Sequence, residues 1–429
     1  MAKSKGRLTL PSERNFLAQT QELLDRWGAD AIRDSDGTKL EEAVKDLDAS
    51  IYTTYFVARN HNDFIKDHME ECQQLYLMSP FHTASEESLA IDFMQGYYRE
   101  QVVPDYHHDP KEWWEVINRT TGQVVPTSQW QVDQERDLVI VEGAEPFHEY
   151  TVSFLVYKIW DPTQMYNHIT NNWGDSVAHD IPFDVRQPYS NRFMSDYLRR
   201  WCQENPKTDV VRFTTFFYHF TLVFNDKAKE KFVDWFGYGA SVSPAAILAF
   251  QEVKGYRLRP EDFVDQGYYN TAFRVPSKAY LDYVDFQSHF VAQEAKKLVD
   301  IVHEAGKEAM MFLGDNWIGT EPYGPYFKDI GLDAVVGSVG GGATLRMIAD
   351  IPHVKYTEGR FLPYFFPDTF YEGNDPTIEA NENWLTARRA IMRKPVDRIG
   401  YGGYLSLAYK FPKFVSYIEE VAGEFRDIY

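Results

Sequence analysis

The stretch Lys307-Glu-Ala-Met-Met-Phe-Leu-Gly-Asp315-Asn-Trp-Ile-Gly-Thr-Glu-Pro-Tyr-Gly-Pro-Tyr326 joins an apolar run to a loop rich in glycine, proline and aromatic residues. The run 308–313 is typical of a parallel strand that is covered on both faces. Asp315 follows it after one glycine, at the end of the strand where parallel α/β folds usually place their chemistry. Asp315 is therefore a candidate catalytic carboxylate, with a turn cap as the alternative.

Strand-like runs recur along the whole chain. Eight candidates lie near residues 30, 52, 152, 212, 310, 336, 355 and 399, and helical patterns separate most of them. This alternation predicts one (β/α)8 TIM-type barrel domain over residues 1–429. Residues 62–148 break the rhythm, so we interpret them as an insertion after the second strand that covers the site. A doubly wound open sheet is the runner-up, but no G-x-G-x-x-G follows the first strand.

Composition narrows the class of partner. A net charge of −20 with a pI near 5.0 disfavours nucleic acid and anionic membranes. Aromatic residues make up 16%, which suits either a carbohydrate cleft or an aromatic core. Two cysteines and the lack of an HExxH or a Cys/His cluster predict no metal site. With no leader-like start and no run of about 18 apolar residues, we expect a soluble, cytoplasmic chain.

Several basic and polar side chains follow predicted strands. Arg33, Arg212 and Arg360 do so in an acidic chain, and guanidinium groups suit phosphate oxygens or sugar hydroxyls. Each could instead pair with a nearby carboxylate. A glycine run, Gly340-Gly341-Gly342-Ala-Thr344, precedes a helix-like segment, where backbone N–H groups could cradle an oxyanion. Glycine triplets are also common turns, and the lack of a Gly-Lys-Ser/Thr motif disfavours nucleotide hydrolysis.

Longer strings resemble the galacto-N-biose/lacto-N-biose phosphorylases. They include Gly28-Ala-Asp-Ala-Ile-Arg-Asp-Ser-Asp-Gly-Thr38, Trp160-Asp-Pro-Thr-Gln-Met-Tyr-Asn-His168, Gly314-Asp-Asn-Trp-Ile-Gly-Thr-Glu-Pro-Tyr-Gly324, and residues 337–352 and 355–372. The resemblance spans nearly the whole chain. It implies a distorted or incomplete TIM-type barrel, without the family's C-terminal α/β and β-rich domains. We expect no cofactor, and we allow for a homodimer.

The resemblance also implies an activity. Such enzymes use inorganic phosphate as a co-substrate to split a β-1,3-galactosyl bond to N-acetylhexosamine, releasing α-galactose 1-phosphate with inversion. By motif, Asp315 would be the general acid. The residues expected to bind the sugars are Arg33, Asn167, Arg212, Trp235, Glu358, Tyr364 and Phe366. For phosphate we assign Arg360, Gly341, Gly342 and Thr344, mainly on chemical grounds.

Two other functions remain open at this stage. A retaining β-galactosidase on the same barrel would need a second carboxylate about 5 Å from Asp315, and Glu358 is the candidate nucleophile. The chain could also be a sugar-binding barrel without turnover. The sequence does not choose between N-acetylglucosamine, N-acetylgalactosamine and rhamnose as the acceptor.

Overall fold

A closed barrel of eight parallel strands forms the centre of the computed structural model, which describes residues 5–35, 39–170, 172–214, 216–234, 237–313, 318–338, 341–361 and 369–429. The predicted fold class is thus confirmed. Around the barrel the strands run in the order β1-β19-β18-β17-β16-β13-β3-β2. Their bounds are β1 Leu8–Ser12, β2 Ala31–Asp34, β3 Ser50–Tyr55, β13 Val210–Phe213, β16 Glu308–Leu313, β17 Ala334–Ser338, β18 Tyr356–Phe361 and β19 Arg398–Tyr401.

Two errors in the predicted strand list offset each other. The strand near residue 152, β12 (Glu149–Lys158), pairs antiparallel with β4 and β8 and is not part of the barrel. The first barrel strand is β1, which the eight predicted strands do not include. The circle of strands is complete, so the expectation of an incomplete barrel is wrong for the strands, and the insertion follows the third strand rather than the second.

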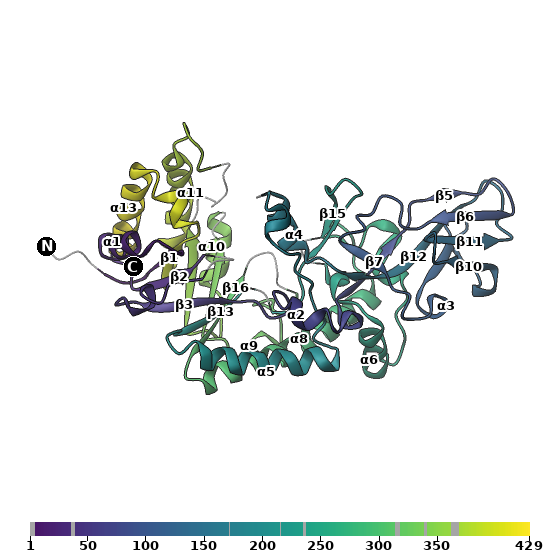
Figure 1. Cartoon of the computed structure of the whole chain (residues 1–429), viewed down its shortest axis with the longest axis horizontal. Coiled ribbons are helices and arrows are strands. Elements are labelled where there is room, and N and C mark those ends of the chain that lie inside the picture. The colour runs from purple at the N-terminus through teal and green to yellow at the C-terminus, as the bar shows by residue number, and fades with distance from the viewer. Residues whose placement is uncertain are drawn as a thin grey trace.

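Helices cover the outside of the barrel (Figure 1). Those that flank the strands are α1 Leu17–Trp27, α5 Pro188–Glu204, α8 Lys278–Glu304, α9 Phe327–Ile330, α10 Gly342–Ala349, α11 Pro376–Ile391, α12 Leu405–Ala408 and α13 Pro412–Ile428. The long α8 begins where the Ser277 hydroxyl accepts the Tyr280 N–H. Between β2 and β3, the described residues form only the 3-10 turn η1 (Val44–Asp46), so the ring of helices is reduced there.

A large insertion separates β3 from β13, and its strands lie at the far end of the molecule from the termini (Figure 1). Its elements are α2 Asn62–Ile65, β4 Gln74–Met78, β5 His82–Thr83, β6 Ser88–Asp92, β7 Val102–Pro104, α3 Pro110–Trp113, β8 Glu115–Asn118, β9 Gln123–Val124, β10 Trp130–Asp133, β11 Leu138–Glu142, β12 and α4 Pro162–Thr170. The boundary predicted at residue 148 is wrong, because β12 is the central strand of the insertion's sheet.

A second excursion follows β13. It contains β14 Thr221–Phe224, β15 Glu230–Asp234, α6 Pro244–Lys254 and α7 Glu261–Val264. One continuous apolar cluster includes Phe213 of β13, Leu313 of β16, Leu298 of α8 and Phe154 of β12. Because barrel and insertion share this core, the insertion is packed against the carboxyl ends of the strands as part of the same folded body.

The amino-terminal end of the barrel carries a repeated cap. Counted from one to eight along the chain, the second, fourth, sixth and eighth barrel strands are β2, β13, β17 and β19. An aspartate stands directly before each of them and accepts a backbone N–H at the start of the barrel strand that precedes it in the chain. These contacts are Asp30 with Leu8 N (3.3 Å), Asp209 with Ile51 N (2.7 Å), Asp333 with Ala309 N (2.7 Å) and Asp397 with Thr357 N (2.8 Å). The strands are therefore fastened in four neighbouring pairs at this end.

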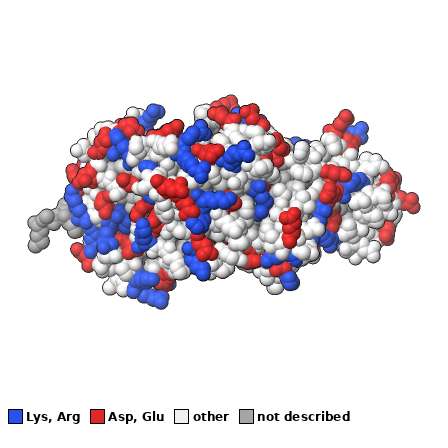
Figure 2. All heavy atoms as spheres, turned by 90° about the horizontal axis from the view of Figure 1, so that it is seen from below, with Lys and Arg blue, Asp and Glu red and all other residues white. Residues whose placement is uncertain are grey.

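The surface seen from below shows acidic and basic side chains interspersed rather than gathered by sign (Figure 2). Among the described helices, none is long and apolar enough to cross a membrane. The same described residues contain no group of three His, Cys, Asp or Glu side chains arranged to hold a metal ion.

Candidate functional site at the carboxyl end of the barrel

The carboxyl ends of the strands bring together most of the predicted site residues that the structure describes. Asp315, Trp235, Tyr364 and Phe366 lie outside the described residues. In the chain, Asp315 comes two residues after the last residue of β16, Leu313. Arg33, Arg212 and Arg360 belong to β2, β13 and β18, and all three are buried.

Arg33 fastens the end of the last barrel strand to the second. Its guanidinium donates to the backbone carbonyls of Asp34 (2.8 Å), Tyr401 (3.2 Å) and Gly403 (3.2 Å). Three hydrogen bonds therefore give Arg33 a role in holding the strand ends together. These bonds also hold the guanidinium, with its charge, at the carboxyl end of β2 beside the loop that follows β19.

Arg212 is connected to β2 through the intervening strand. Asp34 accepts the backbone N–H of Thr54 (2.9 Å) and its hydroxyl (2.5 Å), and Arg212 Nη2 donates to the same hydroxyl oxygen at 2.7 Å. Adjacent strands β2, β3 and β13 thus share one polar chain at their carboxyl ends. Such a chain fixes the direction of the buried Arg212 side chain.

Arg360 lies on the strand next to the one that precedes Gly341 and Gly342. Its neighbour on β17 is Ser338, directly before the residues 339–342 that lead into α10. The Arg360 guanidinium carbon lies 4.2 Å from the centre of the Phe312 ring, a cation–π contact inside the barrel. The carboxyl ends of the sixth and seventh barrel strands are therefore paired, and the glycine-led start of α10 follows the sixth strand along the chain.

Gly341 and Gly342 open α10, and Thr344 lies in its first turn. Gly342 also has a packing reason to be glycine, because a Cβ there would lie 3.3 Å from the Thr386 carbonyl of α11. A Cβ at Gly341 would meet no atom within 4 Å among the described residues. The backbone N–H groups of this first turn are the feature that suits an anion.

Glu358 differs from its prediction. It is the third residue of the six-residue β18 and so lies within the strand rather than at its carboxyl end. Its side chain accepts a hydrogen bond from the Thr9 hydroxyl (2.7 Å) and lies 3.6 Å from Arg398 Nε. A Cβ at Gly400 would come within 2.5 Å of its carboxylate. Glu358 is a buried carboxylate of the barrel interior, tied to β1 and β19.

Asn167 lies on a helix that the sequence patterns did not predict. Pro162–Thr170 form α4, which Figure 1 shows between the barrel and the insertion. The missed signal was Asp161-Pro162, a capping aspartate followed by proline at the first helical position. Asp161, together with Arg59 and His219, forms a buried charged cluster at the start of this helix.

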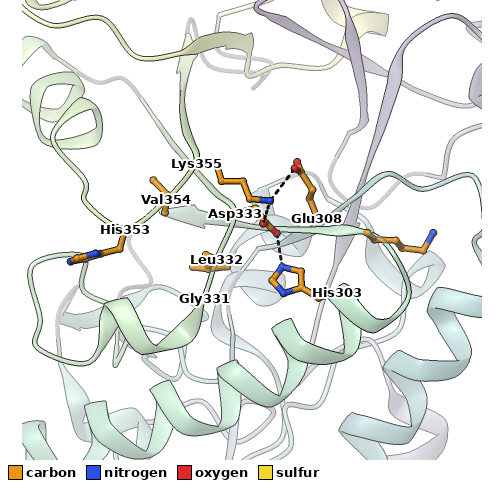
Figure 3. A pocket seen from close by; sticks show the side chains of 9 residues that line it. His303, Glu308, Gly331, Leu332, Asp333, His353, Val354 and Lys355 are labelled. Atoms are coloured by element: carbon orange, nitrogen blue, oxygen red, sulfur yellow. Dashed lines mark hydrogen bonds and ion pairs between the residues drawn. The ribbon is translucent and has the colours of Figure 1, made fainter.

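A separate pocket opens at the opposite, amino-terminal end. Its lining includes His303, Glu308, Asp333 and Lys355, whose side chains point toward one another (Figure 3). Asp333 bonds His303 Nε2 and Lys355 Nζ, both at 2.7 Å, and Lys355 lies 3.7 Å from Glu308. In this cluster each described charge faces an opposite one, which suits a structural clamp rather than a ligand site.

The fold and site define a parallel (β/α)8 barrel with a guanidinium-rich carboxyl end. The family model described as the lacto-N-biose phosphorylase N-terminal TIM barrel domain matches residues 6–429 of the sequence, and the chain belongs to this family.

Among curated relatives, the chain is 58% identical over 426 residues to the 1,3-beta-galactosyl-N-acetylhexosamine phosphorylase of Bifidobacterium longum subsp. longum, covering 99% of this chain and 57% of that protein. A protein of the same description from Lachnoclostridium phytofermentans is 57% identical over 428 residues, covering 100% and 59%. The D-galactosyl-beta-1->4-L-rhamnose phosphorylase of that organism is 40% identical, covering 99% and 60%. The chain thus spans less than two thirds of each relative.

Solved structures add little to this comparison. The alignment with an exo beta-N-acetylglucosaminidase from Vibrio harveyi covers 99% of this chain and 56% of that enzyme's chain, with 10% identity and a TM-score of 0.40. A similarity this low carries no argument about function.

Proposed function

We propose that this chain is the catalytic barrel of an inverting phosphorylase. It splits β-1,3-galactosyl-N-acetylhexosamine disaccharides, such as lacto-N-biose and galacto-N-biose, into α-galactose 1-phosphate and N-acetylhexosamine. The observation that carries the proposal is the 58% identity over 426 residues with a phosphorylase of that description. Inorganic phosphate is the co-substrate, with no bound cofactor. The cytoplasmic location and the homodimer predicted from the sequence belong to the same proposal.

One carboxylic acid is sufficient for this reaction. An inverting hydrolase needs a second carboxylate to activate water, whereas phosphate is already an anionic nucleophile. Asp315 donates its proton to the glycosidic oxygen as phosphate attacks the anomeric carbon from the opposite side. The proton must therefore reside on Asp315 before the bond breaks, which favours a site where the guanidinium groups face the phosphate and the sugars.

The phosphate assignment rests on two adjacent strand ends. Arg360 supplies a positive charge and a forked donor, and the first turn of α10 supplies backbone N–H groups from Gly341 to Thr344. Sugar contacts fall to Arg33 and Arg212 at the barrel end and to Asn167 on α4. By motif, Trp235, Tyr364 and Phe366 complete the sugar site.

The surroundings of Glu358 disfavour the hydrolase alternative. A retaining glycosidase needs an accessible carboxylate about 5 Å from its acid. Glu358 is 3% exposed and already accepts the Thr9 hydroxyl, with Arg398 beside it. We therefore assign Glu358 to support of the strand that presents Arg360, rather than to nucleophilic attack.

The decisive experiment is incubation of the 429-residue chain with Galβ1-3GlcNAc or Galβ1-3GalNAc, with and without phosphate. We expect galactose 1-phosphate only when phosphate is present. Free galactose formed without phosphate would instead indicate the hydrolase. If calorimetry detects disaccharide binding but neither product forms, the chain is a sugar-binding barrel.

A further inference from the structure

Asp161 is the point at which three segments of the chain meet. Its carboxylate is completely buried at the start of α4. One oxygen, Oδ1, accepts the backbone N–H groups of Thr163 (3.0 Å) and Gln164 (2.9 Å), as a helix cap does. The same oxygen accepts Arg59 Nη1 at 3.1 Å, and Oδ2 lies 3.2 Å from His219 Nε2.

The two basic partners stand in segments that follow barrel strands. Arg59 stands in the segment that follows β3, and its guanidinium packs 4.2 Å from the Phe56 ring centre. His219 stands in the segment between β13 and β14. Because β3 and β13 are neighbouring barrel strands, Asp161 fastens the start of α4 to two adjacent strand exits.

The charges in this cluster compensate one another. Burial raises the pKa of Asp161, but His219, Arg59 and the Gln164 N–H lower it more, so its net pKa falls below the usual value. The carboxylate is thus ionised near neutral pH. Two further groups face the cluster: Lys158, whose pKa burial lowers to about 8, and Asp180, whose pKa burial raises to about 6.

The same contacts set the rotation of α4. His219 Nδ1 lies 3.1 Å from the Thr163 hydroxyl, in the first turn of the helix. Residues four apart lie on one face of a helix, so Asn167 is on the face of α4 that Thr163 turns toward His219. The position of Asn167 therefore depends on a bond network whose centre is the Asp161 carboxylate.

We propose that Asp161 is a positioning residue that holds Asn167 in place to bind the acceptor sugar. This inference rests on the proposed function for the identity of the sugar, though its structural part does not. Other bonds hold α4 independently, since Gln164 Nε2 donates to the Ala178 carbonyl (2.9 Å) and His168 Nε2 lies 3.1 Å from the Val177 carbonyl. Loss of the carboxylate charge should thus misplace the helix without unfolding the chain.

The test is Asp161→Asn, with Asp109→Asn as a matched control. Asparagine caps helices as well as aspartate does, so the variant keeps the two cap bonds but loses the charge that Arg59 and His219 require. Asp109 also caps a helix before a proline, through Lys111 N (2.9 Å), and has no ion pair among the described residues. In the synthetic direction we expect Asp161→Asn to raise the acceptor KM about tenfold or more, while the KM for galactose 1-phosphate changes by less than about twofold.

Hydrogen exchange gives a readout that does not need turnover. The peptide that contains residues 162–170 should exchange faster in Asp161→Asn and remain unchanged in Asp109→Asn. Unchanged exchange, or an equal shift of every kinetic constant together with a lower melting temperature, would overturn the positioning role. A wild-type chain that forms no galactose 1-phosphate would refute the proposed function instead, and the exchange comparison would still decide whether Asp161 holds the helix.

Discussion

The two ends of this barrel use aspartate and arginine in opposite ways. At the amino-terminal end, aspartates precede the strands, accept backbone N–H groups and pair with bases, as Asp30 does with Arg398 at 2.6 Å and 3.1 Å. At the carboxyl end, buried arginines stand on β2, β13 and β18. A TIM barrel usually keeps stability at the first end and chemistry at the second. The division is not complete in this chain, because Asp34 at the carboxyl end of β2 also accepts a backbone N–H, that of Thr54, and Arg33 donates to three backbone carbonyls.

Replacing Asp315 by Asn should reduce turnover more than any other change at the carboxyl end of the barrel. The variant keeps the shape of the side chain but has no proton to donate, so turnover should fall ~10²–10⁴-fold. The melting temperature should stay at the wild-type value. Galactose 1-phosphate release from Galβ1-3GlcNAc measures the effect, with Asp329→Asn on the exposed side of α9 as the control. Retention of more than about a tenth of wild-type turnover would end the general-acid assignment.

Arg360→Lys should have a smaller and more selective effect. Lysine keeps the positive charge but loses the fork and the planar contact with Phe312. A hydrogen bond to a charged group contributes about 1.5–3 kcal/mol, so the phosphate KM should rise roughly 10- to 100-fold. The disaccharide KM and the melting temperature should change little. Arg388→Lys, at an ion pair with Glu424 on the outer helices, is the control. An unchanged phosphate KM with lower stability would show that Arg360 is only structural.

Asp333→Asn, at the amino-terminal end, should lower stability and leave activity unchanged. Asp333 accepts Ala309 N and His303 Nε2, both at 2.7 Å, and pairs with Lys355, so loss of its charge should cost about 1–3 kcal/mol of unfolding free energy. We expect no change in kcat/KM for the folded enzyme at neutral pH. A fall in kcat/KM without unfolding would show that this end contributes to catalysis after all.

Acid unfolding sharpens the same prediction. Burial raises the pKa of Asp333, but Lys355, the Ala309 N–H and His303 lower it further, so its folded pKa lies below the usual 3.8. The charge of Asp333 therefore stabilises the fold above pH 3.8, and this contribution is lost as the pH falls through the lower folded pKa. Asp333→Asn should consequently lose less stability than the wild type between neutral and acidic pH, as urea titrations at several pH values would show.

The sequence predicted the kind of fold and seven of the eight barrel strands, but it put β12 in the place of β1. β12 is a ten-residue strand of which all but the first residue are buried, so it resembles a barrel strand, yet it is the central strand of an antiparallel sheet. β1 has five residues and contains Pro11, and a proline argues against a strand when only local sequence is considered. Its pairing with β2 and β19 depends on contacts that no local pattern contains.

The positions of the candidate site residues were predictable where the rule about strand ends was sufficient. Arg33, Arg212 and Arg360 follow from it, because register alone carries them to one end of the barrel. Glu358 lies only two residues before Arg360, yet its partners Thr9 and Arg398 come from strands that the sequence places 349 and 40 positions away. The depth of a side chain inside a barrel is a property of the closed sheet. It has no signature in a single strand.

The four aspartate caps also suggest an order of assembly. Three of them join residues 22, 24 and 40 positions apart, whereas the Asp209–Ile51 cap spans 158. Loop closure grows as the logarithm of length, so closing the span of 158 costs about 1.7 kcal/mol more than closing the span of 24. Three strand pairs can therefore nucleate from local chain, while β3 and β13 must wait until the insertion between them has collapsed. We expect the barrel to close last at this pair, with the insertion setting the rate of folding.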